Sequence, residues 1–390
     1  MSTAVETAPA APAGPPPTTR GARLPLRRLL LAVAAPLAAA VVALLISSLV
    51  LLASGSDPVE VYRTMLDSGT ETRSLLITVN NAVPLYLAGV AVAVGFRAAL
   101  FNIGVEGQYQ LAALLAAAVG AAVELPAALH IGLVLLVAVS VGAAWAGVAG
   151  ALKVTRGVSE VISTIMLNVI AAGIAAYLLA EHLQARVEGS NNSATPPLPD
   201  SAHFPTLDPL LSALGVEVPR GTHLGGFVIV AVVVGIAYWV FISRSRFGFE
   251  LRATGLNPAA AVATGVDVKR TVFTTMLISG ALAGLVGMSQ LLGTAFSYGL
   301  GFTAGLGLTG IGVALLGRNS PVGIALAALL FAFLERSSSS LQFIDVPRQI
   351  YVIMQGSIVL SVVVAYEAVR RIGVAQAERA VRTATDRGAA

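Results

Sequence analysis

The sequence contains no cysteine, only four histidines and only two lysines among its 390 residues. Without cysteine, the chain forms no disulfide and holds no cysteine-ligated zinc or iron–sulfur centre. Charged residues make up 11% of the chain, against about 25% in ordinary soluble domains. Hydrophobic residues make up 56%, and the mean hydropathy is +0.84. So few charges cannot cover the surface of a soluble protein of this size, and the composition indicates a membrane protein.

Motifs of nucleotide hydrolysis and of hydrolytic enzymes are also missing. The chain has no G-x-x-x-x-G-K-[ST] phosphate loop, no H-E-x-x-H and no G-x-S-x-G. Residues 305–310 match G-x-G-x-x-G, but they lie inside an apolar segment and no strand precedes them. We therefore expect this chain to be no enzyme and to bind no nucleotide or other cofactor itself.

The histidines do not form a metal motif. His130, His182, His203 and His223 show no paired ligand spacing, so no metal site is expected. All four fall in segments that we assign below to the outer side, where the sequence predicts solvated loop histidines.

Hydrophobic windows predict an all-α polytopic protein with about ten transmembrane helices. Residues 1–28, rich in Ala, Pro and Thr, cannot form a core and are predicted to be a disordered cytoplasmic tail. The apolar run 29–53 is longer than the 7–15 residues or so of a signal-peptide core, so we expect an uncleaved first helix. The transmembrane domain then covers 29–367, followed by a cytoplasmic tail at 368–390. The expected spans are 29–52, 75–95, 108–124, 126–152, 160–180, 225–243, 271–293, 303–317, 321–335 and 349–367.

Basic residues favour one orientation for these spans. With the N-terminus inside, only six of the 24 basic residues fall on the outer side: Arg63, Arg73, Arg186, Arg220, Arg336 and Arg348. Cytoplasmic loops carry the excess of Lys and Arg. The sequence thus predicts an even number of spans with both termini in the cytoplasm.

Two loops between spans are unusual. The outer loop 181–224 is long and proline-rich, and it is either a docking surface for a binding protein or a passive solvated cap. The inner loop 243–270 contains Asn257 as a candidate N-cap and Pro258 at the first helical position. A short helix over 258–264, ending at Gly265, is therefore expected. Such a helix is either a connector or the contact through which a soluble partner acts.

Polar residues interrupt the apolar pattern most clearly in FNIGVEGQ, residues 101–108. Asn102, Glu106 and Gln108 lie between apolar neighbours there. A carboxylate at membrane depth is costly unless it is paired or faces water, so it suggests a functional site. The alternative is an ordinary cytoplasmic turn with Arg97 as an interfacial anchor. Asn168, in the span 160–180, fits either a functional role or hydrogen bonding between helices.

Five segments together resemble a known family. They are FNIGVEGQ, TIMLNVIAA (164–172), FGFELRATGLNPAAAVATGV (247–266), ISGALAGLVG (278–287) and GVALLGRNSPVGI (312–324). They resemble the membrane permease subunit of ABC-type importers of nucleosides and simple sugars, over roughly residues 75–370. The longer permease of the nucleoside branch is most similar. Leu308-Thr309 stands where relatives commonly carry an aromatic–acid pair.

The resemblance implies a permease in a bacterial cell membrane and several partners. These are a separate ABC ATPase subunit, a second, non-identical permease, and an extracytoplasmic substrate-binding lipoprotein; no nucleic acid is expected. We assign the substrate pathway to Asn102, Glu106, Gln108, Asn168 and Thr309. We assign coupling to the ATPase to Arg252, Gly255, Asn257, Pro258 and Gly265.

Two other functions remain open from the residues alone. A secondary transporter driven by protons or sodium would need acidic residues at midplane acting as a relay. A polytopic scaffold or enzyme without transport activity would need neither a pathway nor an ATPase partner.

Overall fold

The computed structural model describes residues 26–371 apart from 186–192, 366 and 369–370. The first 25 residues of the expected N-terminal tail, and most of the expected C-terminal tail, lie outside the described residues. The described chain is predominantly helical, and the part that the structure describes contains no strand, only two isolated bridges. The all-α prediction is confirmed.

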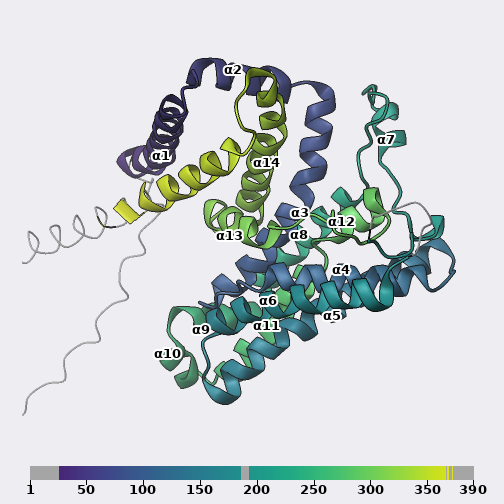
Figure 1. The fold of residues 1–390 in the computed structure, drawn as a ribbon. Helices are drawn as coiled ribbons and strands as arrows, with labels where there is room; N and C mark the ends of the chain where they lie inside the picture. Colours follow the sequence, from purple (N-terminus) through teal and green to yellow (C-terminus); the bar gives the residue numbers. More distant parts are fainter. Residues whose placement is uncertain (1–25, 186–192, 366, 369–370, 372–390) are drawn as a thin grey trace, which may run out of the picture.

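Fourteen α-helices and several short 3₁₀ or π segments follow one another in the described chain (Figure 1). The α-helices are α1 (Leu26–Ala53), α2 (Pro58–Gly69), α3 (Thr72–Arg97), α4 (Val105–Ala121), α5 (Ala127–Arg156), α6 (Glu160–Leu178), α7 (Asp208–Ala213), α8 (Phe227–Arg244), α9 (Arg246–Leu256), α10 (Pro258–Ala263), α11 (Val268–Gly284), α12 (Met288–Gln290), α13 (Leu306–Leu316) and α14 (Pro321–Ser337). The short segments are η1 (Leu179–Leu183), η2 (Asp200–Ala202), η3 (Leu291–Ala295) and η4 (Ser338–Ile344), and a further apolar helix covers Ile350–Ala365.

Six helical segments among the described residues are long and apolar enough to cross a membrane. They are Thr72–Arg97, Ala127–Arg156, Glu160–Leu183, Phe227–Arg244, Val268–Ala295 and Pro321–Ile344. Six of the ten expected spans therefore have full-length helices. The first expected span corresponds to α1, which is followed by α2 after a sharp bend of 114° between Ala40–Ala53 and Pro58–Gly69. The spans expected at 108–124, 303–317 and 349–367 correspond to shorter helices.

Helix α3 lies at the centre of the packing. It contacts α8, α11, α13 and α14, and its side chains are almost continuously buried between Ala82 and Gly95. Beside it, α4, α5, α6 and α11 pack along one another. Helices α5 and α11 are so close at Gly280 that a Cβ added there would lie 2.3 Å from the Gly142 carbonyl oxygen. The small-residue pattern at Gly280 and Gly284 thus lets two helices touch, as sequence patterns of this kind predict.

Helix α13 is too short to be the full span expected at 303–317. Its 11 residues extend about 16 Å, which is about half of a 30 Å hydrocarbon core. Residues 301–305 also match G-x-x-x-G, but they are not helical. Gly305 has φ +88° and is the N-cap of α13, and a Cβ added at Gly301 would meet no atom within 4 Å. This pattern makes a turn that starts a half-length helix, and it does not pack two helices together.

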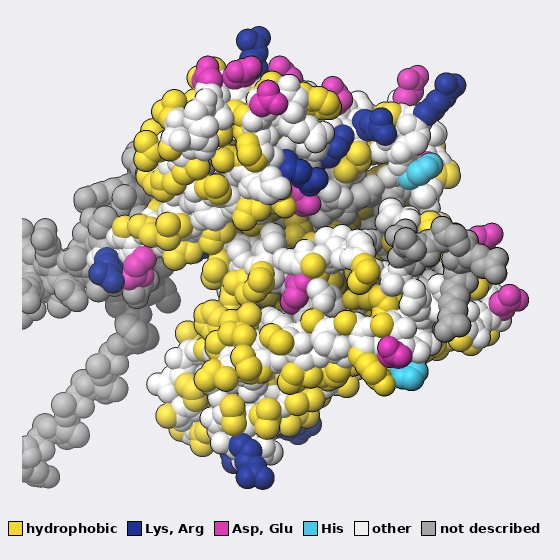
Figure 2. Space-filling model, in the orientation of Figure 1, with side chains coloured by type: hydrophobic (Ala, Val, Ile, Leu, Met, Phe, Trp, Pro, Cys, Tyr) yellow, Lys and Arg dark blue, Asp and Glu magenta, His cyan; other side chains and the backbone are white. Residues whose placement is uncertain are grey.

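Large apolar side chains are exposed along α5, α6 and α8, for example Leu136, Val169 and Val233. Hydrophobic side chains cover much of the face shown in Figure 2, and most charged side chains lie toward its edges. A surface of this kind is stable against lipid hydrocarbon and costly in water. The chain is an integral membrane protein.

The two ends of the helical bundle carry different structures. Helices α9 and α10 lie at one end and α7 at the other (Figure 1). We call them the short-helix end, residues 245–267, and the long-loop end, residues 184–226. Segments expected on the same side of a membrane meet at each end. Arg97 Nη2 donates to the Asn319 carbonyl near the short-helix end, and Asn80 Nδ2 donates to the His223 carbonyl at the long-loop end.

Candidate functional site

The polar stretch 101–108 forms an irregular break between α3 and α4. Asn102 and Gln108 pair their amides reciprocally: Asn102 Nδ2 donates to Gln108 Oε1 at 3.0 Å, and Gln108 Nε2 donates to Asn102 Oδ1 at 2.9 Å. Asn102 Nδ2 also donates to Ser279 Oγ of α11, and that hydroxyl donates to the Ala91 carbonyl of α3. The pair therefore fastens α3, α4 and α11 together where the helix is interrupted.

Asn168 of α6 closes the same break from the other side. Its Oδ1 accepts from the Gly107 N–H at 2.9 Å, and its Nδ2 donates to the Ile103 carbonyl at 2.9 Å. One side-chain amide thus satisfies both a donor and an acceptor of backbone that has no helical partner. The close fit requires glycine at 107, because a Cβ there would lie 2.9 Å from Asn168 Cα.

Glu106 lies where the starts of two helices meet. It is in the first turn of α4, and its carboxylate also reaches the first turn of α13. Oε1 accepts from the Gly305 N–H at 2.7 Å, and Oε2 accepts from the Gly307 N–H at 2.9 Å. Gln110 Nε2 donates to Oε1 at 2.7 Å. The contact depends on Gly307, since a Cβ at this residue would lie 2.4 Å from the Glu106 backbone nitrogen.

This arrangement explains how an acidic side chain is tolerated among apolar helices. The first N–H groups of a helix have no intrahelical partner, and the helix dipole favours negative charge at that end. Glu106 supplies the acceptors for α13 and stands at the favourable end of α4 as well. The carboxylate is therefore stabilised by backbone N–H groups, and no cation is needed beside it.

Tyr109 extends the cluster toward the long-loop end. Its hydroxyl lies 2.9 Å from Glu106 Oε1 and 2.8 Å from the Thr303 carbonyl, so it can donate its proton to either oxygen. The Thr303 N–H in turn donates to Gln290 Oε1 at 3.3 Å. A continuous chain of hydrogen bonds thus joins Gln290 near the end of α11–α12 to Glu106 and the start of α13.

The structure brings four of the five predicted pathway residues into this one cluster. Asn102, Glu106, Gln108 and Asn168 all surround the break, and Asn102 and Gln108 are each 1% exposed. Such burial shows that this stretch is not a solvent-exposed turn. Arg97, the proposed anchor of that turn, instead donates to the Asn319 carbonyl. Thr309 lies on the next turn of α13, where its hydroxyl donates to the Gly305 carbonyl at 2.9 Å.

Three residues of the cluster were missed in the sequence. Tyr109 and Gln110 lie three and four residues after Glu106, which is the helical spacing that brings side chains together. That spacing was available as a signal. Ser279 lies in another helix, and nothing in its local sequence identifies it as the partner of Asn102.

The residues assigned to coupling form the short-helix end. Asn257 is the N-cap of α10, and its Oδ1 accepts from the Ala260 N–H at 3.1 Å. Pro258 begins the helix, and Gly265, with φ +84°, follows its end. The predicted short helix is therefore observed one residue shorter, over 258–263. Gly255 packs on the end of α3, because a Cβ there would lie 2.3 Å from the Arg97 carbonyl oxygen.

This end also exposes apolar and charged side chains. Leu256 is 88% exposed, and Phe249 and Val262 are exposed too. Arg252 lies half-buried on α9. Large apolar side chains that lie together on a short helical surface are unfavourable in water. Their exposure is typical of a contact surface.

The described part of the long loop packs partly against the helices. Leu198 and Ala202 are buried in the core, and the Leu198 N–H donates to the Phe296 carbonyl. His130, expected in a solvated loop, is fully buried: its ring bonds Ser201 Oγ and the Gly120 carbonyl, each at 2.8 Å. The expectation was wrong for this residue because the loop folds back over the start of α5.

A second histidine of the loop is paired with an acid. His223 Nδ1 lies 2.6 Å from Asp208 Oδ2, and the Leu224 N–H donates to Asp208 Oδ1. Burial opposes ionisation, but these donors outweigh it and hold the pKa of Asp208 below its usual value. No group of three His, Asp or Glu side chains placed to hold a metal occurs in the described ranges.

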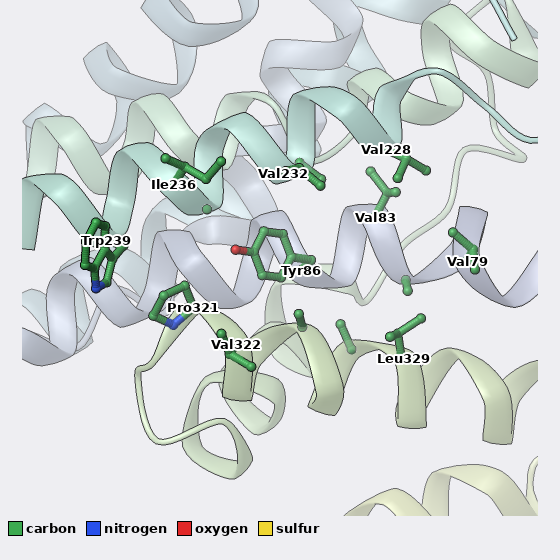
Figure 3. A pocket seen from close by; sticks show the side chains of 15 residues that line it. Val79, Val83, Tyr86, Val228, Val232, Ile236, Trp239, Pro321, Val322 and Leu329 are labelled. Carbon is green, nitrogen blue, oxygen red and sulfur yellow. The ribbon is translucent and has the colours of Figure 1, made fainter. Parts of the chain in front are cut away.

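An apolar groove of about 560 Å³ lies between α3, α8 and α14. Figure 3 shows Tyr86, Val232, Ile236 and Leu329 among its walls. The groove offers almost no polar group to a solute, and its three helices belong to the apolar spans. Its chemistry suits lipid hydrocarbon, so it is a poor candidate for the passage of a polar solute.

Comparisons with known proteins agree with this architecture. The family model described as "Branched-chain amino acid transport system / permease component" matches residues 74–363. The guanosine ABC transporter permease protein NupP of Bacillus subtilis is 36% identical over 323 residues, covering 82% of this chain and 89% of the relative. The glucose ABC transporter permease protein TsgB13 of Haloferax volcanii is 34% identical, covering 84% and 86%. The nucleoside ABC transporter permease protein NupB of Lactococcus lactis is 30% identical, covering 82% and 87%.

Proposed function

Because this chain belongs to the family of branched-chain amino acid transport system permease components, it is a membrane transport subunit, and we propose that its solute is a neutral nucleoside or a related sugar. Membership in this family favours an ABC permease over a proton- or sodium-coupled transporter and over a non-transport scaffold. The relatives reported above are named for guanosine, nucleosides and glucose, all of which are uncharged at neutral pH.

The observation that carries the choice of a neutral solute is the engagement of Glu106. Half-length helices in transporters commonly direct their N-termini at an anionic group of the substrate. Here the N-terminus of α13 is already occupied by the protein's own carboxylate, through Gly305 and Gly307. A solute carboxylate would find its donors taken and a negative charge beside them. A neutral solute with hydroxyl and amide groups meets no such repulsion.

The proposed path runs beside the cluster and is bounded by its partly exposed residues, Glu106, Gln110 and Thr309. In this proposal Asn102, Gln108 and Asn168 do not touch the solute. They hold the break in position. A second permease subunit, non-identical to this chain, would supply the facing wall. No metal and no cofactor takes part; ATP is bound by the partner ATPase.

We place the short-helix end in the cytoplasm, with both termini, and so assign the chain an even number of passes. Residues 244–270 carry five basic and two acidic side chains, consistent with the positive side of a membrane protein. The ATPase subunit would dock on α9 and α10, where Leu256 and Val262 are exposed. The long-loop end would face outward and receive the solute from a substrate-binding lipoprotein.

Uptake by cells that express the chain together with its partner subunits tests the solute class. We expect unlabelled guanosine or uridine to compete with radiolabelled guanosine, and we expect leucine to have no effect. Poisoning ATP synthesis should stop uptake, and a proton ionophore added while ATP is maintained should not. Competition by leucine, or loss of uptake with the ionophore alone, would contradict the proposal.

A further inference from the structure

A small polar pocket of about 310 Å³ opens at the long-loop end. Its walls come from two segments far apart in the sequence. Ser193 and Ala194 of the long loop form one wall, and the stretch between Gln290 and Phe302 forms the other. The volume lies at the lower end of the 300–1,000 Å³ or so that is common for small-molecule sites.

The backbone around the pocket is irregular and firmly held. Residues Leu291–Ala295 form a π-helical turn, and Phe296 after it has φ +51°, which is unusual for a residue other than glycine. Both features cost energy and are frequent at functional sites. The long loop fixes this shape: Thr195 Oγ1 accepts from the Tyr298 N–H at 3.0 Å, and the Thr195 N–H donates to the Tyr298 carbonyl at 2.8 Å.

The chemistry of the lining suits an uncharged solute with hydroxyl groups and a planar ring. Gln290, Ser193 and Ser297 supply an amide and two hydroxyls, which can both donate and accept hydrogen bonds. Phe302 supplies an aromatic ring, backed by Tyr298 with 4.8 Å between ring centroids. None of the described lining residues is charged. A ribosyl purine or pyrimidine matches both halves of this lining.

The position of the pocket connects it to the deep cluster. Gln290, which lines the pocket, accepts from the Thr303 N–H, and the Thr303 carbonyl lies within hydrogen-bonding distance of the Tyr109 hydroxyl. Tyr109 contacts Glu106, whose carboxylate holds the start of α13. A solute that competes for the Gln290 amide would therefore disturb a chain of hydrogen bonds that ends at the half-length helix.

We infer that this pocket is the outer solute site of the permease, where a nucleoside first binds through Gln290, Ser193 and the ring of Phe302. This inference rests on the proposed function. Thr303 and Tyr109 then act as positioning residues: they touch no solute in the pocket and connect its occupancy to the Glu106–α13 contact.

The absence of cysteine allows a direct test of occupancy. Ser297→Cys places the only thiol of the chain in the pocket, and Ser212→Cys places a control thiol on α7, exposed at the same end but outside the pocket. Both full-length variants, purified with their partner subunits and placed in nanodiscs, are labelled with a small maleimide. Guanosine should slow labelling at position 297 and leave position 212 unchanged, and leucine should slow neither. Equal labelling rates with and without guanosine at position 297 would overturn the inference.

Kinetics separate binding in the pocket from passage through the cluster. For Gln290→Ala we expect KM for guanosine to rise about tenfold, which corresponds to one lost hydrogen bond. For Tyr109→Phe introduced into the Ser297→Cys variant, we expect guanosine protection at position 297 to persist while the maximal uptake rate falls. Unchanged KM in Gln290→Ala would contradict the inference even where the wild-type complex imports guanosine. If the wild-type complex imports leucine and no nucleoside, the proposed function itself fails.

Discussion

The break at residues 101–108 and the short-helix end at 245–267 both interrupt the long helices, but their polar groups are satisfied in different ways. Each contains one asparagine and several other polar residues. In the break, the polar groups find partners on other helices, such as Ser279 of α11 and Asn168 of α6. In the short-helix end, Asn257 caps its own helix and makes no such long-range bond among those described.

The difference follows from what surrounds each segment. Water satisfies any group left open at a membrane surface, so local caps are sufficient there. Inside the helical bundle each unpaired backbone group costs free energy, so every one needs a partner supplied by the fold. A substitution in the break should therefore change stability first. A substitution at the short-helix end should change partner binding first.

Glu106→Ala should produce the largest loss of stability. It strands the N–H groups of Gly305 and Gly307, and since each buried group left unpaired costs about 1–3 kcal/mol, the two together predict a loss of about 2–6 kcal/mol. Thermal unfolding in detergent, followed by size-exclusion chromatography, measures the effect. Glu250→Gln is the control, because the partner of Glu250 among the described residues is the exposed Arg246, and the loss of such a surface pair should matter little. An unchanged melting temperature in Glu106→Ala would contradict our account of the α4–α13 contact.

The Asn102–Gln108 pair provides a smaller and more specific test. Each single substitution to alanine strands the partner amide, whereas the double substitution removes both amides together. We expect each single variant to lose about 1–3 kcal/mol and the double variant to lose less than the sum, with a coupling of about 0.5–3 kcal/mol. Melting temperatures of the four proteins in the cycle report this coupling. Strict additivity would show that the reciprocal amide bonds at 2.9 and 3.0 Å contribute nothing as a pair.

The sequence predicted the short-helix end well because its structure depends on neighbours in the chain. Asn257, Pro258 and Gly265 act within a few residues of themselves, so position and residue type were sufficient. The break was located from the same kind of pattern, since Asn102, Glu106 and Gln108 stand out among apolar residues. Their partners could not be predicted, because Ser279, Gly305 and Gly307 are brought to them only by the packing of α11 and α13.

The number of spans stays a prediction where helix length and hydrophobicity no longer agree. The apolar window at 303–317 is real, but Gly305 starts the helix late and leaves 11 residues, about half the length of a span. The prediction for His130 was wrong for a different reason. This residue lies near the outer end of the span expected at 126–152 and was expected to be solvated, whereas residues 198–202 fold back over it and supply Ser201 as a partner. No local window of the sequence contains this tertiary contact.

Substitutions of Leu256 and Leu214 should change stability least, and they give the clearest contrast between the two ends. They are 88% and 70% exposed, at the short-helix end and the long-loop end respectively. Neither Leu256→Ser nor Leu214→Ser should lower the melting temperature, because neither side chain is packed in this chain. Burial of a leucine in a partner contributes about 1.5–3 kcal/mol, so Leu256→Ser should weaken capture of the ATPase subunit about tenfold or more. Co-purification of the tagged chain with its ATPase, with Leu214→Ser as the matched control, measures this. Equal recovery of the ATPase by both variants would place the ATPase contact elsewhere on the molecule.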